Sequence, residues 1–398
     1  MKFTIVTGVS KSHLLRTIRL LSDRDLFRTG FTSYVPSKNL IIKLSPLRIQ
    51  EKFFSRSEDI QGLSCSSSLF AEIIYQIGRW LMRKNFIAFA DWFISYSFVI
   101  FSHFANATIR KTPNNENEIL LVRAGFGSRI KKGNRKFVCD ASLAHPSTLP
   151  SLVANGHFGL TETKSLSRVD RLILRDMNLA DKILVNSDFV KESFIFAGVH
   201  HEKIAVAYLP PLPHFQKNTN LSHEYDGTLR LLFAGGLEER KGIVLLREIS
   251  DELLLRKVNF ELILIGNWGK VESDVRNAIL ANPKVKYRSW VSQEVLAEEI
   301  MNADIFLFPS YAEGSARVVT EAMALGKVVI TTWNSGSPIT HGFDGIIADL
   351  NSESLIFWIN KVICNPNFKY QLESKARETT LTKTTESGYC SILESLFS

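Results

Sequence analysis

The chain has 398 residues, of which 45% are hydrophobic and 22% charged, and this is the composition of a globular protein. Such a length predicts two or three domains. The four cysteines (Cys65, Cys139, Cys364 and Cys390) stand far apart without a CxxC pair, and the nine histidines are scattered. These spacings argue against a zinc site or a disulfide framework, so we expect no metal cofactor and a reducing, cytoplasmic compartment.

The formal charge of +8 is spread unevenly. In residues 1–210, 29 basic against 17 acidic residues give +12, whereas 19 against 23 in residues 211–398 give −4. The basic half predicts an anionic partner, either an anionic membrane surface or a phosphate-bearing lipid substrate. Nucleic acid is disfavoured, because no zinc-finger, RRM-like or helix-turn-helix pattern is present. A merely soluble basic surface remains the alternative.

The longest apolar stretch runs from Phe86 to Phe101 and contains Asp91. It is shorter than a membrane span requires, and the apolar run in the first ten residues is too short for a signal peptide. We therefore expect no membrane-spanning segment. Because Asp91, Ser95 and Ser102 recur at roughly helical spacing, the stretch predicts a buried amphipathic helix, with an interfacial membrane helix as the alternative.

In chain order, the first half alternates strands with helices. A strand at 3–7 is followed by the turn "GVS" and by a helix with Leu14, Ile18 and Leu21 on one side. Further strands are expected at 119–122, 137–139, 182–185 and 204–207, and helical stretches at 69–106 (with breaks) and 190–197. This alternation predicts βαβ units and a parallel sheet.

Residues 208–228 are rich in proline and asparagine without periodicity and predict a linker. A second series follows, with strands at 229–234, 260–265, 285–287, 305–308 and 328–331 and helices at 242–255, 272–281, 293–301 and 316–325. We expect two doubly wound, Rossmann-like α/β domains, residues 1–210 and 211–398, with a C-terminal helix that can cross back. Ligands then belong in the cleft at the carboxyl ends of both sheets.

The stretch "LLFAGGLEERKGIVLL" (231–246) opens the second domain. Gly235 and Gly236 follow a strand and would let a ligand approach the backbone, and Arg240 and Lys241 precede a helix. Two cations at a helix N-terminus are suited to phosphate. An ordinary strand-to-helix turn with solvated cations is the alternative.

The stretch "SYAEGSARVVTEAMALG" (310–326) carries Glu313 just before a predicted helix and Glu321 two turns inside it. The amides of Gly314 and Ser315 would point to an anion at the N-terminus of that helix. Alternatively, Glu321 forms a surface ion pair with Arg317, four residues away, and Glu313 merely favours the helix dipole.

Together these stretches resemble the family 4 retaining glycosyltransferases (glycosyl transferases group 1), which have the GT-B fold. Glu313 and Glu321 match the family's Glu-x7-Glu motif, "GGLEERKG" its phosphate-contacting loop and "GFDGIIAD" a later glycine-containing segment. The stretch 179–211 is similar to the family's sequence across the domain boundary. The resemblance covers residues 160–349 well, and the first 110 residues only in general layout.

The resemblance implies that Lys241, with Arg240, binds the diphosphate of a nucleotide-sugar. Glu321 would hold the ribose hydroxyls, and Glu313 would contact the transferred sugar near the reacting centre. The amides of Gly314 and Ser315 would complete the sugar–phosphate site. One departure is Gly236, where many members have an arginine. No metal is required if Lys and Arg supply the charge.

On the acceptor side, Asp140 and His145 follow a predicted strand end in the first domain. A histidine there could hydrogen-bond the reacting hydroxyl, because its charge switches near neutrality. A capping aspartate and a solvated histidine are the alternative. Gly8, in the first strand-to-helix turn, matches the glycine loop that faces the cleft in the family.

The sequence thus predicts a retaining hexosyltransferase that uses a nucleotide-diphosphate sugar and a glycan or lipid-linked acceptor in polysaccharide or glycoconjugate biosynthesis. We expect it in the cytoplasm, either free or peripheral on the inner face of the cytoplasmic membrane. The alternative is a non-catalytic GT-B protein that binds a nucleotide-sugar or a partner subunit, for which Gly236 is the best support. An epimerase or a phosphorylase on the same fold is a third possibility, but no lysine for pyridoxal phosphate is evident.

Overall fold

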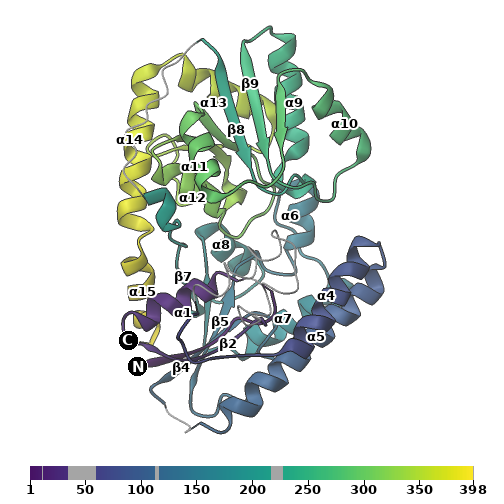
Figure 1. Ribbon diagram of the computed structural model, residues 1–398, viewed down its shortest axis with the longest axis vertical. Coiled ribbons are helices and arrows are strands. Elements are labelled where there is room, and N and C mark those ends of the chain that lie inside the picture. Colours follow the sequence, from purple (N-terminus) through teal and green to yellow (C-terminus); the bar gives the residue numbers. More distant parts are fainter. Residues whose placement is uncertain (11, 35–59, 113–115, 217–226, 398) are drawn as a thin grey trace.

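A computed structural model describes residues 1–10, 12–34, 60–112, 116–216 and 227–397. In these residues two parallel sheets lie one above the other in Figure 1. The first sheet has the order β3-β2-β1-β4-β5-β6-β7. Its strands are β1 (Lys2–Val6), β2 (Phe27–Thr32), β3 (Cys65–Ser67), β4 (Glu118–Arg123), β5 (Lys136–Ala141), β6 (Lys182–Val185) and β7 (Ile204–Val206).

The second sheet has the order β10-β9-β8-β11-β12-β13, and all its pairs are parallel. Its strands are β8 (Leu229–Ala234), β9 (Phe260–Ile265), β10 (Val285–Arg288), β11 (Ile305–Phe308), β12 (Val328–Thr332) and β13 (Ile346–Ala348). In each sheet the strand order changes sense beside the first strand, between β1 and β4 in one and between β8 and β11 in the other. Each sheet therefore has a topological switch point, the place where parallel sheets bind ligands. The expected fold class, two doubly wound α/β domains, is confirmed.

Helices cover both faces of each sheet (Figure 1). In the first domain they are α1 (Leu14–Ser22), α4 (Leu69–Arg83), α5 (Ile87–Ile109), α6 (Leu149–Asn155), α7 (Arg168–Leu179) and α8 (Asp188–Phe196). In the second they are α9 (Ile243–Leu255), α10 (Ser273–Ala281), α11 (Gln293–Asn302), α12 (Arg317–Ala324), α13 (Ser352–Ile363), α14 (Pro366–Lys383) and α15 (Glu386–Glu394). Fully buried strand residues such as Leu231, Leu262 and Phe306 form the core of the second domain.

The chain's last helix returns to the first domain. In Figure 1, α14 runs along the second domain and α15 ends beside the N-terminus and α1. Tyr389 Oη of α15 lies 3.1 Å from Thr17 Oγ1 of α1, and Glu386 pairs with Arg16. Burial of Tyr389 and Cys390 against α1 gives this helix an apolar anchor on the first sheet.

The linker and the apolar stretch differ from the sequence-based expectation. Residues 213–216 of the expected linker form the short 3-10 helix η3 (Pro213–Gln216), while 217–226 lie outside the described residues. The apolar stretch continues to Ile109, so α5 has 23 residues, and the length argument against a membrane span was wrong. Among the described residues, α5 is the one helix that by length and composition could cross a membrane, and 39% of its most apolar part is buried.

The orientation of α5 differs in part from the sequence interpretation. Ser95 and Ser102, whose spacing predicted a buried amphipathic helix, are both buried, and Asp91 caps a neighbouring helix. The large side chains of Phe89, Trp92 and Tyr96, however, are exposed. The helix therefore buries Ser95 and Ser102 together with apolar residues such as Phe98 and Phe101, and it leaves Trp92, Tyr96 and His103 exposed.

Candidate functional site

The turn after β8 places two cations at the carboxyl end of the second sheet. β8 ends at Ala234, Gly235 and Gly236 follow, and the 3-10 helix η4 (Glu239–Lys241) leads into α9. Gly242 has φ of 83°, and a Cβ on it would lie 2.0 Å from the carbonyl oxygen of Pro309, so only glycine fits. This close approach brings Arg240 and Lys241 against the segment that follows β11.

Both cations meet the carboxylate of Glu313. Arg240 Nη1 and Lys241 Nζ lie 2.9 Å and 3.1 Å from Glu313 Oε1. Arg240 also reaches Glu238 at 2.9 Å through its other terminal nitrogen and donates to the carbonyl of Ala312. The side chains of Lys241 and Glu313 are only 19% and 13% exposed, so solvent screens this cluster weakly. The structure thus unites three of the residues that the sequence predicts to bind one ligand.

The loop between Glu313 and α12 presents unused hydrogen-bonding groups. The amides of Glu313 and Ala316 donate to the carbonyls of Asn334 and Ser335 at 2.8 Å and 3.0 Å. Between them, the amides of Gly314 and Ser315 have no acceptor within the described part of the chain. The hydroxyl of Ser315 is buried and equally without a partner there. Unpaired donors beside a helix N-terminus and two cations form an anion site.

Glu321 lies on the buried side of α12 with 6% of its surface exposed. Burial raises the pKa of its carboxyl to about 7, and the charge of Arg317 one turn earlier opposes this shift. A surface ion pair, the alternative considered from the sequence, does not describe a carboxyl so deeply buried. An acid held in this way would gain a great deal from a ligand that donates hydrogen bonds to it.

The loop carrying Gly314 touches the first domain. A Cβ on Gly314 would lie 1.6 Å from the carbonyl oxygen of Ser142, in the loop after β5. The hydroxyl of Ser187, the residue that caps α8, donates to the carbonyl of Gly314. The second-domain cluster therefore lies at the boundary between the two domains, as the GT-B interpretation expects of a cleft site.

On the first-domain side, Asp140 pairs with a residue that the sequence analysis missed. Asp140 is 1% exposed, and its Oδ1 lies 3.1 Å from Nε2 of His13 on the N-terminal side of α1. Its Oδ2 is buried with no hydrogen-bond partner among the described residues. His13 in turn lines a small gap with Arg317 and Tyr389, which connects this pair to the start of α12. The partners are 127 residues apart, so no local pattern could reveal them.

His145 contacts other residues than Asp140 does. Its ring packs edge-on against Phe194, and its Nδ1 accepts from the amide of Ser147 at 3.3 Å. Burial lowers the pKa of His145 to about 4, so the ring is neutral at pH 7. The expectation that its charge switches near neutrality is therefore wrong, although a neutral ring can still donate one hydrogen bond.

Gly8 occupies a left-handed turn at φ of 75°, where a Cβ would lie 2.4 Å from the ring of Phe126. Two further residues hold this turn. Arg123 of β4 donates to the carbonyl of Val9 at 3.2 Å, and Glu72 of α4 accepts from the amide of Ser10 at 3.3 Å. The turn is thereby fixed by groups from a strand and from a helix. In the described residues no hydrogen bond or ion pair joins Gly8 or His145 to Arg240, Lys241 or Glu313.

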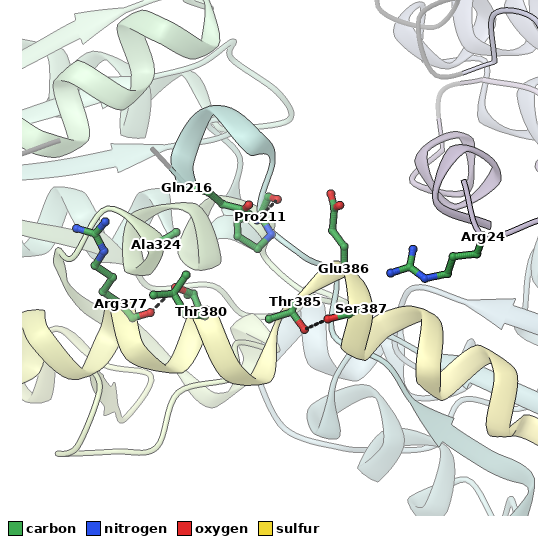
Figure 2. A pocket seen from close by; sticks show the side chains of 10 residues that line it. Arg24, Pro211, Gln216, Ala324, Arg377, Thr380, Thr385, Glu386 and Ser387 are labelled. Atoms are coloured by element: carbon green, nitrogen blue, oxygen red, sulfur yellow. Dashed lines mark hydrogen bonds between the residues drawn. The ribbon is translucent and has the colours of Figure 1, made fainter. Parts of the chain in front are cut away.

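Another hollow, of about 310 Å³, lies where α14 passes into α15 (Figure 2). Arg24, Arg377 and Glu386 line it, and none of the predicted site residues does. Within the described ranges no three His, Cys, Asp or Glu side chains are grouped to hold a metal ion. Neither feature adds to the site built from the two strand ends.

Solved structures of the same architecture cover essentially the whole chain. HepE of Anabaena, solved with UDP and glucose, aligns with a TM-score of 0.65 over 100% of this chain and 99% of its own, at 16% identity. TarM of S. aureus aligns with a TM-score of 0.69 over 100% of this chain and 99% of its own, at 11% identity. At these identities the likeness concerns the fold, and the fold is GT-B.

Sequence comparison adds similarity to known glycosyltransferases. Residues 228–365 match the family described as glycosyl transferases group 1. D-inositol 3-phosphate glycosyltransferase of Pseudarthrobacter chlorophenolicus is 29% identical over 168 residues, 38% of this chain and 40% of its own. Lipopolysaccharide 1,2-N-acetylglucosaminetransferase of Salmonella typhimurium is 24% identical over 228 residues, 51% and 58% respectively. Residues 228–365 are thus similar to the group 1 glycosyl transferases, within a chain that has the GT-B fold, and the chain spans about two fifths to three fifths of these relatives' length.

Proposed function

We propose that this protein transfers a hexose from a nucleotide-diphosphate sugar to a glycan or lipid-linked acceptor, with retention of the anomeric configuration. The observation that carries the proposal is the convergence of Arg240, Lys241 and Glu313 beside the unpaired amides of Gly314 and Ser315. Relatives and structural neighbours bear names or titles that mention sugar transfer and UDP, which fits the same class of donor.

In this proposal the diphosphate binds Arg240, Lys241 and the start of α12. The two cations are neutralised by Glu313 and Glu238 before the donor arrives. The incoming diphosphate would compete with these carboxylates, and Glu313 would then turn toward hydroxyls of the transferred sugar. Glu321 would accept hydrogen bonds from the ribose, which would stabilise its ionised form.

The proposed reaction follows from the charge that develops. The bond between the anomeric carbon and the diphosphate breaks, and its electron pair leaves with the phosphate. The acceptor oxygen forms the new bond on the same face, and its proton passes to the departing phosphate oxygen. Cations and amides that are already in place stabilise the leaving group without rearrangement, so no metal ion is needed for that charge.

On the acceptor side, we include Gly8, Asp140 and His145 in the proposed cleft, together with the newly found His13. The basic balance of residues 1–210 supports an acceptor carrying phosphate or lying at an anionic lipid surface, on the cytoplasmic side.

Gly236 favours a second candidate, a non-catalytic nucleotide-sugar binder or partner subunit, because many members have an arginine there. Against it, the guanidinium of Arg240 reaches the same carboxylate oxygen as Lys241, so a second cation is available without an arginine at 236.

Release of nucleoside diphosphate from a panel of UDP-, GDP- and ADP-sugars, with and without candidate acceptors, separates the two. We expect one donor to be turned over, and Lys241→Ala or Arg240→Ala to lower the rate by about 10²–10³-fold. Arg256→Ala is a matched control, because Arg256 is half exposed and pairs with Glu252 on α9, away from Arg240 and Lys241. Binding of a nucleotide-sugar without any release would favour the non-catalytic candidate.

A further inference from the structure

The turn between α4 and α5 is a projecting apolar tip. Apart from Leu81, every residue from 79 to 89 is exposed. Among them Trp80, Phe86, Ile87 and Phe89 have between 54% and 64% of their surface in solvent. Figure 1 shows this end of the helical hairpin pointing away from both sheets. Such a concentration of large apolar side chains marks an interaction surface.

The hairpin formed by α4 and α5 is attached to the rest of the first domain by hydrogen bonds on its inner side. Ser102 accepts a hydrogen bond from the amide of Arg129 at 2.8 Å, and Asp91 accepts one from the amide of Arg168 at 3.0 Å. A Cβ on Gly78 would lie 2.7 Å from Ile94, which shows how closely α4 and α5 cross. Asp91, Ser102 and Asn106 of α5 thus accept hydrogen bonds from other segments of the protein, while the rings of Trp92 and Tyr96 are exposed.

A row of arginines lies immediately behind the tip. Arg168, Arg171 and Arg175 recur at helical spacing on α7 and are all exposed. Together with Trp92 and Tyr96 of α5 they line a groove of about 400 Å³. Arg79, Arg83 and Lys84 add three exposed cations at the tip itself. These six cations place positive charge beside the apolar surface, and the carboxylate of Asp91 on α5 accepts hydrogen bonds from the amides at the N-terminus of α7.

From this arrangement we propose that residues 79–89 and the groove between α5 and α7 form a docking surface for an anionic lipid bilayer. Phe86 and Trp92 are six residues apart, which is about 9 Å along a helix. Interfacial helices bury their apolar face to roughly 5–10 Å. With the tip immersed to that depth, Trp92, Tyr96 and the arginine row lie at the level of the phosphates, where aromatic residues and cations are favoured.

The same hairpin reaches the glycine turn of the first domain. Glu72, near the N-terminus of α4, accepts from the amide of Ser10, beside Gly8. A bilayer at the tip would therefore be connected to the acceptor side of the site through a single helix. The proposed membrane docking does not depend on the proposed sugar transfer. If both hold, the cleft lies above an acceptor that is held in the membrane.

Flotation with vesicles of phosphatidylcholine, with and without phosphatidylglycerol, tests the surface in the absence of nucleotide and acceptor. We expect the protein to float with the anionic vesicles, and Arg168→Gln/Arg175→Gln to lower that partition by roughly 30-fold, since each cation near such a surface contributes about one factor of five. Phe86→Ser/Phe89→Ser should abolish binding. Leu255→Ser/Tyr370→Ser, on two equally exposed residues of the second domain, should leave it unchanged.

A blue shift of tryptophan emission on anionic vesicles, lost in Trp80→Phe, would place the tip in the bilayer. Equal loss in the control variant, or no flotation of the wild type, overturns the proposal. A dimer in solution that Phe86→Ser/Phe89→Ser dissociates, without vesicle binding, would assign the surface to a second copy of the chain instead. Because flotation is measured without donor or acceptor, and release of nucleoside diphosphate without vesicles, failure of either proposal is recognised separately.

Discussion

At the scale of single residues, the site contains buried polar groups that lower the free energy of unfolding when no ligand is bound. Glu321 is an ionisable acid with little solvent around it, and Ser315 and Asp140 carry buried oxygens without a partner in the described residues. Such groups cost free energy unless a ligand satisfies them. Their gathering near the domain boundary is what we expect of residues selected for binding rather than for folding.

Glu321→Gln should make the protein more stable at alkaline pH. The pKa of this carboxyl is about 7 in the folded protein against 4.5 as its ordinary value, so the folded state binds its proton more tightly. The wild type therefore loses stability from this group as pH rises from 4.5 through 7, up to roughly 3 kcal/mol.

Chemical unfolding of both proteins from pH 4 to pH 8 measures this difference. The two curves should meet near pH 4, and the glutamine variant should be the more stable at pH 8. A constant difference across the range would show that ionisation of Glu321 is not the cause.

At the scale of elements, strands that consist of short apolar runs were predicted closely in both domains. The bounds of β8, β9 and β11 agree with the sequence-based ones because each is a short, almost continuous apolar run between turn residues. β2 (Phe27–Thr32) alternates with polar residues and contains a glycine, and β3 (Cys65–Ser67) has no apolar run, so both were missed. Their place in the sheet is decided by parallel pairing, of β2 with β1 and of β3 with β2, which is a tertiary effect.

The candidate site shows the same division. Arg240, Lys241 and Glu313 were found because two local motifs carry them, and the structure brings the motifs together. His13, Glu72 and Arg123 were missed because their contacts join elements between 62 and 127 residues apart. The burial of His145 could not be predicted from the sequence either, because it depends on packing against Phe194, which is distant along the chain.

The contact between α5 and α7 gives a prediction at this scale. Asp91 accepts from the amides of Arg168 and Val169, the first two residues of α7, and thus supplements the cap that Ser167 provides. Asp91→Ala should lower the free energy of unfolding by about 1 kcal/mol, the usual cost of losing a helix cap. Asp251→Ala, on an exposed position of α9, is the control and should change little. Equal stabilities for wild type and Asp91→Ala would remove this account of how the hairpin is held.

At the scale of the whole molecule, the two domains meet at the site and again at the C-terminal helix. Gly314 lies against Ser142, Asn334 donates to the carbonyl of Gly156 at 2.7 Å, and α15 rests on α1. The loop that follows Glu313 therefore lies against the first domain. A change at this boundary should affect transfer more than it affects nucleotide binding.

Gly314→Ala tests that expectation. The added Cβ would lie 1.6 Å from the Ser142 carbonyl oxygen, so the loops must separate. We expect the transfer rate to fall at least about tenfold, since small misplacements of reacting groups are costly. Affinity for nucleoside diphosphate should change much less. Gly342→Ala, which has a positive φ but no atom near its Cβ, is the control for a glycine replaced without a contact between the domains. A transfer rate unchanged in Gly314→Ala would show that closure does not matter.

The central claim is that a diphosphate takes the place of the Glu313 carboxylate on Arg240 and Lys241. Calorimetric titration of nucleoside diphosphate into wild type, Lys241→Ala, Glu313→Gln and the control Arg256→Ala tests it most directly. We predict that Lys241→Ala weakens binding at least about tenfold, a loss typical of one charge-assisted contact, while Glu313→Gln binds as tightly as wild type or more tightly. Unaltered affinity in Lys241→Ala would contradict the account.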